Sequence, residues 1–332
     1  MLNTVLRIQN SSIIVISGLF SRYCNIEFVV PMKLCCFLSF PYPSFFRNIL
    51  VWTLLLTTFL PPAQSQTLFG GFMLGGMNYQ GELQDKYFTF KGINAAVGIS
   101  TLFALSDRFS FSAELMRGSL KGSDARPDSR NRIRNLQFAT NIYELSAAGR
   151  INVFTDQEIP FTPYLVGGGS VFHIDPFTLD EKGGKVYLFP LSTEGQGLAE
   201  YPDRPFNNRI NIAMFGGAGI EFRVTKKLRV DFEIAIRKSF TDYIDDVSTT
   251  YPDPNLLYPA FGALSVQYSY RGDEVSGGNP TFQTGAQRGN PATADWFHMV
   301  FVRLRYPIFD RAVDVGYPRY FFRKNRWPYS NY

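Results

Sequence analysis

Four aspartates gather just after the most regular strand pattern in the sequence, and they are candidates for chemistry. They are Asp242, Asp245, Asp246 and Asp253. Clustered carboxylates can hold calcium, and two paired acids can drive hydrolysis. The spacing lacks the D-x-D-x-D-G order of a calcium loop, and nothing nearby supplies a partner for hydrolysis. We therefore expect no metal here, and a role in ordering a loop by capping a short turn or by pairing with Arg237 and Lys238.

The histidines offer little more. The sequence holds only two, His173 and His298, so a metal site built from several histidines is nearly excluded. Asp295 lies three residues before His298, but no recognisable serine, histidine and acid motif accompanies it. We expect no catalytic residues and no cofactor.

The pattern that must position these residues is a period-2 alternation of apolar and polar side chains, typical of strands with two different faces. In "LRVDFEIAIRK", Leu228, Phe232 and Ile234 point one way, opposite Asp231 and Glu233. No helix-period pattern of useful length occurs after residue 66. The alternation predicts eight strands, at about 68–79, 91–103, 108–117, 143–153, 162–174, 210–224, 228–238 and 296–306.

The connections between these strands alternate between long and short. Short turns such as "ALSDR" and "TKK" follow every second strand, and long segments such as 175–208 and 239–295 follow the others. All short turns then lie at one end and all long loops at the other. This asymmetry predicts an all-β fold: an eight-stranded antiparallel up-and-down transmembrane β-barrel with four long extracellular loops, located in the outer membrane. Closing the sheet also removes its free edges.

Alternation alone does not tell which face points outward. A soluble lipocalin-like barrel would place its apolar face inside, around a ligand. We favour apolar-out, because the polar face carries opposite charges in close succession and because aromatic residues sit near strand ends, where interfacial girdles form. These aromatic residues are Phe103, Phe109, Phe154, Tyr164, Phe240, Trp296 and Tyr306.

An eight-stranded barrel has an interior just wide enough for its own side chains. The charged residues of the inward face are therefore expected to form a structural ionic network that fills the lumen, and no pore. They are Glu114, Glu144, Arg150, Glu221, Arg223, Arg229, Asp231, Glu233, Arg237, Arg303 and Arg305.

The N-terminal part carries an export signal. Arg47 precedes an apolar run from Ile49 to Leu60, and Ala63 and Ser65 form a small-x-small cleavage site before Gln66. We expect residues 1–65 to be an upstream extension plus signal peptide, with Met32 as a better start, and residues 66–306 to be the barrel. All three cysteines lie upstream of this site, so the mature protein relies on no disulfide.

Residues 307–332 form a basic and aromatic tail expected in the periplasm. Such a mixture can bind single-stranded nucleic acid, but that partner is not expected there, and the net charge of +5 does not by itself predict one. Contact with an envelope protein or with the membrane surface is the favoured role.

Four separated segments, occurring in order, carry a family resemblance. They are "GGMNYQGEL", "LSTEGQGL", "FTDYIDDVSTTYPDP" and "GAQRGNPATADWF". Over about residues 68–306 the chain resembles the PorG-like family of small outer-membrane barrels from Bacteroidota-type bacteria, whose best-known member is a component of the type IX secretion system.

The resemblance implies a non-enzymatic barrel in contact with outer-membrane lipid and with a periplasmic ring of PorK-like and PorN-like proteins. It also implies ordered outer loops. One contains Thr193, Glu194, Gly195 and Gln196, and the other contains Asp242, Asp245, Asp246 and Arg288. We expect these two loops to pack over the barrel mouth, with Arg288 paired to Asp245 or Asp246. Two alternatives stay open: a lipid-modifying barrel enzyme, favoured by a serine, histidine and acid near Asp295 and His298 on the lipid-facing side, and the soluble ligand-binding barrel.

Overall fold

The computed structural model describes residues 13–15, 29–31, 67–84, 89, 92–125, 129, 131–154, 159–225, 227–278 and 281–310. The chain divides into two compact units, Met1–Ala63 and Gln64–Tyr332. In the first unit, β1 (Ile13–Val15) pairs with β2 (Val29–Pro31) in antiparallel register. The predicted signal segment and the tail beyond Asp310 lie outside the described residues.

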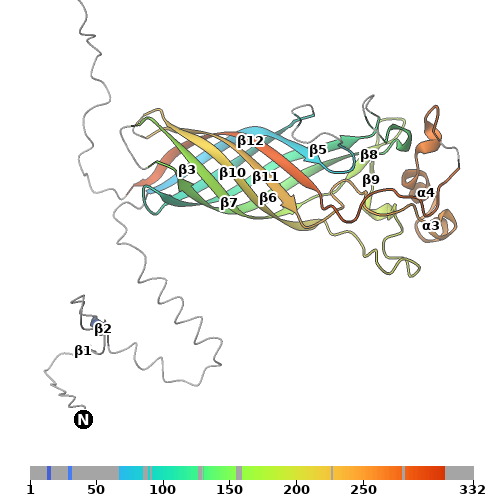
Figure 1. Ribbon diagram of the computed structural model, residues 1–332, viewed down its shortest axis with the longest axis horizontal. Coiled ribbons are helices and arrows are strands. Elements are labelled where there is room, and N and C mark those ends of the chain that lie inside the picture. The colour runs from blue at the N-terminus through green and yellow to red at the C-terminus, as the bar shows by residue number, and fades with distance from the viewer. Residues whose placement is uncertain are drawn as a thin grey trace, which may run out of the picture. The chain divides into compact units, whose positions relative to one another are not determined.

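The second unit is a closed antiparallel barrel (Figure 1). Its strands are, in chain order, β3 (Thr67–Gln80), β4 (Asn94–Ala104), β5 (Phe109–Ser123), β6 (Gln137–Asn152), β7 (Phe161–His173), β10 (Ile210–Arg223), β11 (Arg229–Ser239) and β12 (Trp296–Asp310). Each barrel strand pairs with its neighbours in the chain, β12 pairs with β3, and β5 and β6 pair from Phe109↔Ile151 to Ser123↔Gln137. The predicted eight-stranded up-and-down barrel is confirmed.

The apolar side chains of the alternating strands point out of the barrel. Leu145 is 60 % exposed and Ile234 is 52 % exposed, whereas Glu144 and Glu233 beside them are buried. Such a belt requires lipid around it, because large contiguous apolar surface is not stable in water. The soluble alternative is therefore wrong, and the barrel is an outer-membrane barrel. No helix among the described residues is long and apolar enough to cross a bilayer.

The connections fall at two ends, as predicted. Short turns link β4 to β5, β6 to β7 and β10 to β11, and the long segments gather at the other end, where Figure 1 shows α3 and α4. The long segments contain β8 (Phe177–Leu179), β9 (Lys185–Tyr187), α3 (Pro254–Phe261), α4 (Ala263–Ser269) and the 3₁₀ helices η2 (Arg132–Arg134), η3 (Phe189–Leu191) and η4 (Gly272–Glu274).

The sequence shows no helix-period pattern after residue 66, yet the structure contains the two short helices α3 and α4. Both helices are too short to show periodicity, and Pro259 lies inside α3. Only local capping chemistry marked the start of α3: the Asp253 carboxylate accepts a hydrogen bond from the Asn255 backbone N–H, and Pro254 follows it.

An apolar core fills the outer end of the barrel, between the lumen and the long loops. Met77, Phe172 and Phe297 contribute from the strands, and Ile244 and Val247 come down from the loop between β11 and β12. The loops are thereby anchored to the barrel by buried apolar contacts as well as by the polar contacts described next.

Candidate functional site

The long loops close over the barrel mouth in one hydrogen-bonded assembly, here called the loop cap. Its described residues are 81–84, 124–125, 131–136, 174–209, 240–278 and 281–295. These ranges come from all four long connections, so the cap depends on contacts far apart in the sequence.

Glu194 is the centre of the loop cap. Its carboxylate is fully buried and accepts hydrogen bonds from the backbone N–H groups of Ser248 and Thr249, each at 2.9 Å. The Thr249 hydroxyl donates to it at 2.6 Å, and Arg288 Nη1 lies 2.8 Å from Oε1. Because a buried carboxylate is costly without partners, this set of donors ties the β7–β10 loop firmly to the β11–β12 loop.

Arg288 reaches several partners from this position. Its guanidinium also donates to the backbone carbonyls of Asp246 and Ser269, and Nη2 lies 3.9 Å from Asp246 Oδ2. The expected packing of the two loops over the mouth is present, and the expected pairing with Asp246 is present as a longer contact, while the shortest ion pair of Arg288 is with Glu194. Arg288 pairs mainly with Glu194, since Asp246 offers its carboxylate to the Thr193 hydroxyl and Asp245 turns toward the barrel.

The turn that carries Glu194 has an unusual backbone. Ser192 and Gly195 have φ of 47° and 74°, and the Gln196 amide oxygen accepts from the Glu194 backbone N–H at 3.0 Å. A Cβ at position 195 would approach the Tyr201 ring to 2.7 Å. Glycine is thus required at 195 both by its φ and by this close contact. Across the loops, Arg204 donates to the Glu194 and Thr250 carbonyls.

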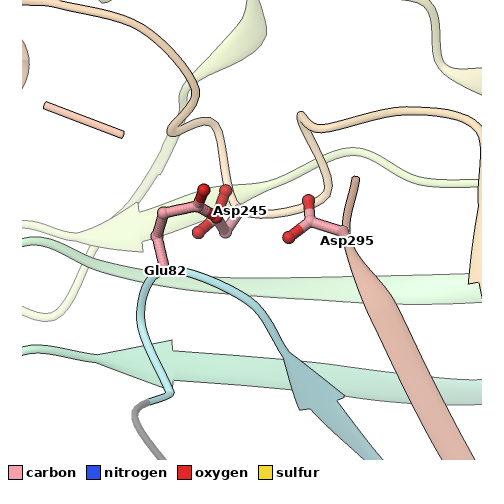
Figure 2. Close-up of side chains that lie close together, drawn as sticks. All are labelled: Glu82, Asp245 and Asp295. Carbon is pink, nitrogen blue, oxygen red and sulfur yellow. The ribbon is translucent and has the colours of Figure 1, made fainter. Parts of the chain in front are cut away.

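A group of three carboxyls lies within the loop cap and is shown in Figure 2. Glu82, Asp245 and Asp295 each offer an oxygen atom within 4.8 Å of the others. The Tyr79 hydroxyl lies 2.6 Å from Asp245 Oδ2 and 2.8 Å from Asp295 Oδ1. Since one hydroxyl has a single hydrogen to donate, both contacts are satisfied when one of the two carboxyls is protonated. We interpret the group as a proton-sharing cluster, because Tyr79 occupies the space between the two aspartates.

The pKa values of these acids agree with that interpretation. Burial, reinforced by the neighbouring carboxylates, raises the pKa of Asp245 and of Asp295 well above the ordinary range. Burial, followed by the charge of Asp242, raises the pKa of Glu82 to about 7, and burial raises that of Asp242 to about 8. Burial also raises the pKa of Asp246 to about 7, although Arg288 and Thr193 oppose the shift.

Three groups that order the loop cap were missed from the sequence. Tyr79, at the outer end of β3, could have been recognised as inward-facing by its alternation with Met77. Arg134 donates to Asp124 at 2.6 Å and to the Arg288 carbonyl. Glu82 lies within the segment "GGMNYQGEL", but its contact with Asp245 and Asp295 could not be foreseen, because these two residues belong to the last long loop.

Below the apolar core, the lumen holds several buried ion pairs. Arg237 pairs with Glu144 at 2.8 Å, so it does not serve the aspartates of the cap. Arg303 bridges Glu114 at 2.6 Å and Glu233 at 3.1 Å. The side chains come from strands across the barrel, and the lumen is filled by them.

The network converges on Glu221 near the other end. Arg150 and Arg305 each lie 2.6 Å from Glu221 Oε2, and Arg229 lies 2.9 Å from Oε1. Arg305 also contacts Asp231 at 2.5 Å. Arg223, also named for the lumen, lies half-buried at the end of β10 and donates to the Thr162 hydroxyl at 3.0 Å.

Tyr164 does not belong to an interfacial girdle. It is buried in the lumen, where it donates to Glu233 at 2.9 Å and stacks with the Arg150 guanidinium 3.6 Å from its ring centroid. Its alternation with Leu165, which is 57 % exposed, places it inside.

The histidines do not form a lipid-facing site. His298 is 5 % exposed but belongs to the outward-facing positions of β12, with Trp296 and Val302, whereas Asp295 is 1 % exposed and its carboxylate faces inward to the Tyr79 hydroxyl, so the two side chains point to opposite sides. His173 packs on the outer surface against Tyr143, with 6.4 Å between ring centroids. The arrangement that would favour a lipid-modifying enzyme is therefore absent from the described residues.

A family model described as "Domain of unknown function (DUF6089)" matches residues 47–267, which is more than half of the chain. The chain belongs to the DUF6089 family. In this DUF6089 protein the match includes the strands from β3 to β11, Glu194 and the four aspartates, and it ends before Arg288 and Asp295. A comparison with curated protein sequences gave no significant match.

Solved outer-membrane barrels resemble this DUF6089 chain. Neisserial surface protein A is 10 % identical with a TM-score of 0.37, over 72 % of this chain and 96 % of that one. A major outer membrane protein from Thermus thermophilus is 9 % identical with a TM-score of 0.33, over 72 % and 98 %. Outer Membrane Protein W of E. coli is 10 % identical with a TM-score of 0.29, over 74 % and 100 %. The barrel assignment of the DUF6089 protein rests on its own strand pairing.

Proposed function

We propose that this protein is a non-enzymatic scaffold of the outer membrane, and that it serves as a component of type IX protein secretion. The observation that carries the proposal is spatial. The four sequence segments on which the PorG-like resemblance rests lie far apart in the chain, yet they meet in the loop cap. Tyr79 and Glu82 come from the first, Glu194 from the second, Asp245 from the third, and Asp295 from the fourth.

The closed interior favours the function of a scaffold and disfavours that of a channel. Arginine and acid side chains fill the lumen, an apolar core lies above them, and the loop cap covers the mouth. A passage for solutes would require this network to be broken, and removing one partner of a buried ion pair costs roughly 3–5 kcal/mol. The barrel is thus suited to holding partners at the membrane.

The expected partners are periplasmic ring proteins similar to PorK and PorN. On the described part of the chain, the surfaces within their reach are the short turns, including Ser106 and Asp107 between β4 and β5. The test is photo-crosslinking in the source bacterium, with the crosslinking amino acid placed at Asp107 and, as a matched control, at Lys182 in the turn between β8 and β9.

Crosslinks to ring proteins from position 107 and none from position 182 are expected. After deletion of the gene, proteins with a C-terminal secretion signal should remain inside the cell. If neither position reaches a ring protein and secretion is unchanged, the protein serves another role in the envelope and the type IX assignment is rejected.

A further inference from the structure

Two strands of the barrel continue outward past the lipid belt. Leu115 is the last large apolar side chain on the outer surface of β5, and it is 54 % exposed. Arg117 follows on the same face and stacks with Tyr143 of β6, 5.4 Å from its ring centroid. An outward arginine on an interfacial tyrosine is typical of the level where acyl chains meet headgroups. Residues beyond it lie at headgroup height.

At that height the sheet widens. The short hairpin of β8 and β9 joins the edge of β6 through the pair Ala139↔Phe177, at the end of the barrel that carries the loop cap (Figure 1). Lys121 of β5 is the direct neighbour of Ala139 on the other side. Residues opposite one another in antiparallel strands point to the same face. The small Ala139 therefore lies between a lysine and an aromatic ring.

A groove of about 400 Å³ occupies this place. Residues that line it include Lys121, Gln137, Phe177 and Leu179, together with Asn94, whose side-chain amide donates to the Gly92 carbonyl. A sugar that bears a negative charge is recognised by three kinds of group: an amide that hydrogen-bonds its hydroxyls, an aromatic face, and a cation.

The charge at the groove is available to a ligand. Lys185 of β9 lies over the Phe177 ring, 4.4 Å from its centroid. Neither Lys121 nor Lys185 forms an ion pair with a residue that the structure describes. The nearby Asp180 is engaged within its own turn, where its carboxylate accepts from the backbone N–H groups of Lys182 and Gly184.

We propose that this groove binds the phosphorylated sugar headgroup of a glycolipid in the outer leaflet. Lys121 and Lys185 contact the phosphate, Gln137 bonds a sugar hydroxyl, and Arg117 lies at the level where the acyl chains begin. The position argues for a lipid source, because a ligand held at this height keeps its chains against the apolar surface of β5 and β6.

The test uses the full protein purified from outer membrane and inserted in phosphatidylcholine vesicles with a small fraction of a diphosphorylated glycolipid. Retained glycolipid is counted by native mass spectrometry. Lys121→Gln combined with Lys185→Gln removes the charges, and Ala139→Trp fills the groove without changing charge. Lys238→Gln is the matched control, because Lys238 also points outward on an aromatic ring, 5.2 Å from the Trp296 centroid, on the strands β11 and β12. Unboiled gel mobility verifies that each variant is folded.

We expect both groove variants to retain at least about fivefold less glycolipid, which is the loss of roughly one charge-assisted hydrogen bond. The Lys238 control should retain as much glycolipid as the unaltered protein. The unaltered protein should retain the dephosphorylated glycolipid as poorly as the groove variants retain the phosphorylated one. Equal retention by all variants, or an equal loss in the Lys238 control, overturns the proposal. Displacement by inorganic phosphate alone also overturns it, because the site would then be one for a free anion.

Discussion

The carboxylate of Glu194 and the guanidinium of Arg288 lie 2.8 Å apart, and both side chains are almost completely buried. They join two loops that are separated by nearly a hundred residues of sequence. Because Arg288 also donates to backbone carbonyls on both sides, the pair fixes the position of several segments at once.

Replacing Arg288 with methionine should open the loop cap and leave the barrel folded. The change leaves the Glu194 carboxylate buried without its cation, at a cost of roughly 3–5 kcal/mol. Limited proteolysis should therefore cut within residues 240–295 many times faster, while the mobility shift in unboiled gels persists. Arg209→Gln serves as control, since the Arg209–Asp175 pair is exposed and such pairs contribute about 0–1 kcal/mol. Unchanged proteolysis of the Arg288 variant would remove Glu194 from the centre of the cap.

The loop cap should loosen as the pH rises. Carboxyls in the opened loops have a pKa near 4, whereas in the closed cap the pKa is about 7 for Glu82 and Asp246 and about 8 for Asp242. Because these acids bind more protons in the closed cap than in the open one, their contribution to its stability is fully present below about pH 4 and is lost between about pH 4 and pH 8. Proteolysis of the loops should accelerate over this range. A cap that tightens with rising pH contradicts the proton-sharing interpretation.

Asp245→Asn should stabilise the cap at neutral pH. The amide keeps an oxygen for the Val247 backbone N–H and offers a hydrogen to the Tyr79 oxygen, while the Tyr79 hydroxyl donates to Asp295. The variant thereby replaces a protonated carboxyl with a group that never ionises. Proteolysis at about pH 7 should slow, and its pH dependence should flatten. If the variant instead loosens the cap and added calcium tightens the unaltered one, the carboxyls hold a cation.

Glu221→Gln should weaken the lumen network strongly. Arg150, Arg229 and Arg305 would lose their shared carboxylate, and Asp231 alone would remain for the buried Arg150 and Arg305, at a cost of up to roughly 3–5 kcal/mol. The temperature at which the folded band disappears from unboiled gels should fall. Arg223→Gln, at the half-buried end of the lumen, should shift it little. Equal shifts in the two variants would mean that the convergence on Glu221 carries no special stability.

The alternation of residues predicted the barrel and most of its interior correctly, because each position along a strand reports directly which face it occupies. Glu114, Glu221 and Arg303 were placed inward by this rule. Tyr164 was misplaced when its position near a strand end was given more weight than its alternation with Leu165.

The loop cap could be predicted only in outline. Loops have no periodicity, so the sequence indicated which segments matter and not which atoms meet. The pairing of Arg288 with Glu194, and the place of Tyr79 between Asp245 and Asp295, depend on how four loops fold back over one apolar core. Helices as short as α3 and α4 take their stability from that same packing.

The most direct test of the closed scaffold is electrical recording from the purified protein in a planar lipid bilayer. A lumen filled with ion pairs beneath an apolar core and a hydrogen-bonded cap predicts a folded, inserted barrel that shows no stepwise conductance. Regular single-channel steps from the unaltered protein would contradict it, and the lumen would then have to be regarded as a gated passage.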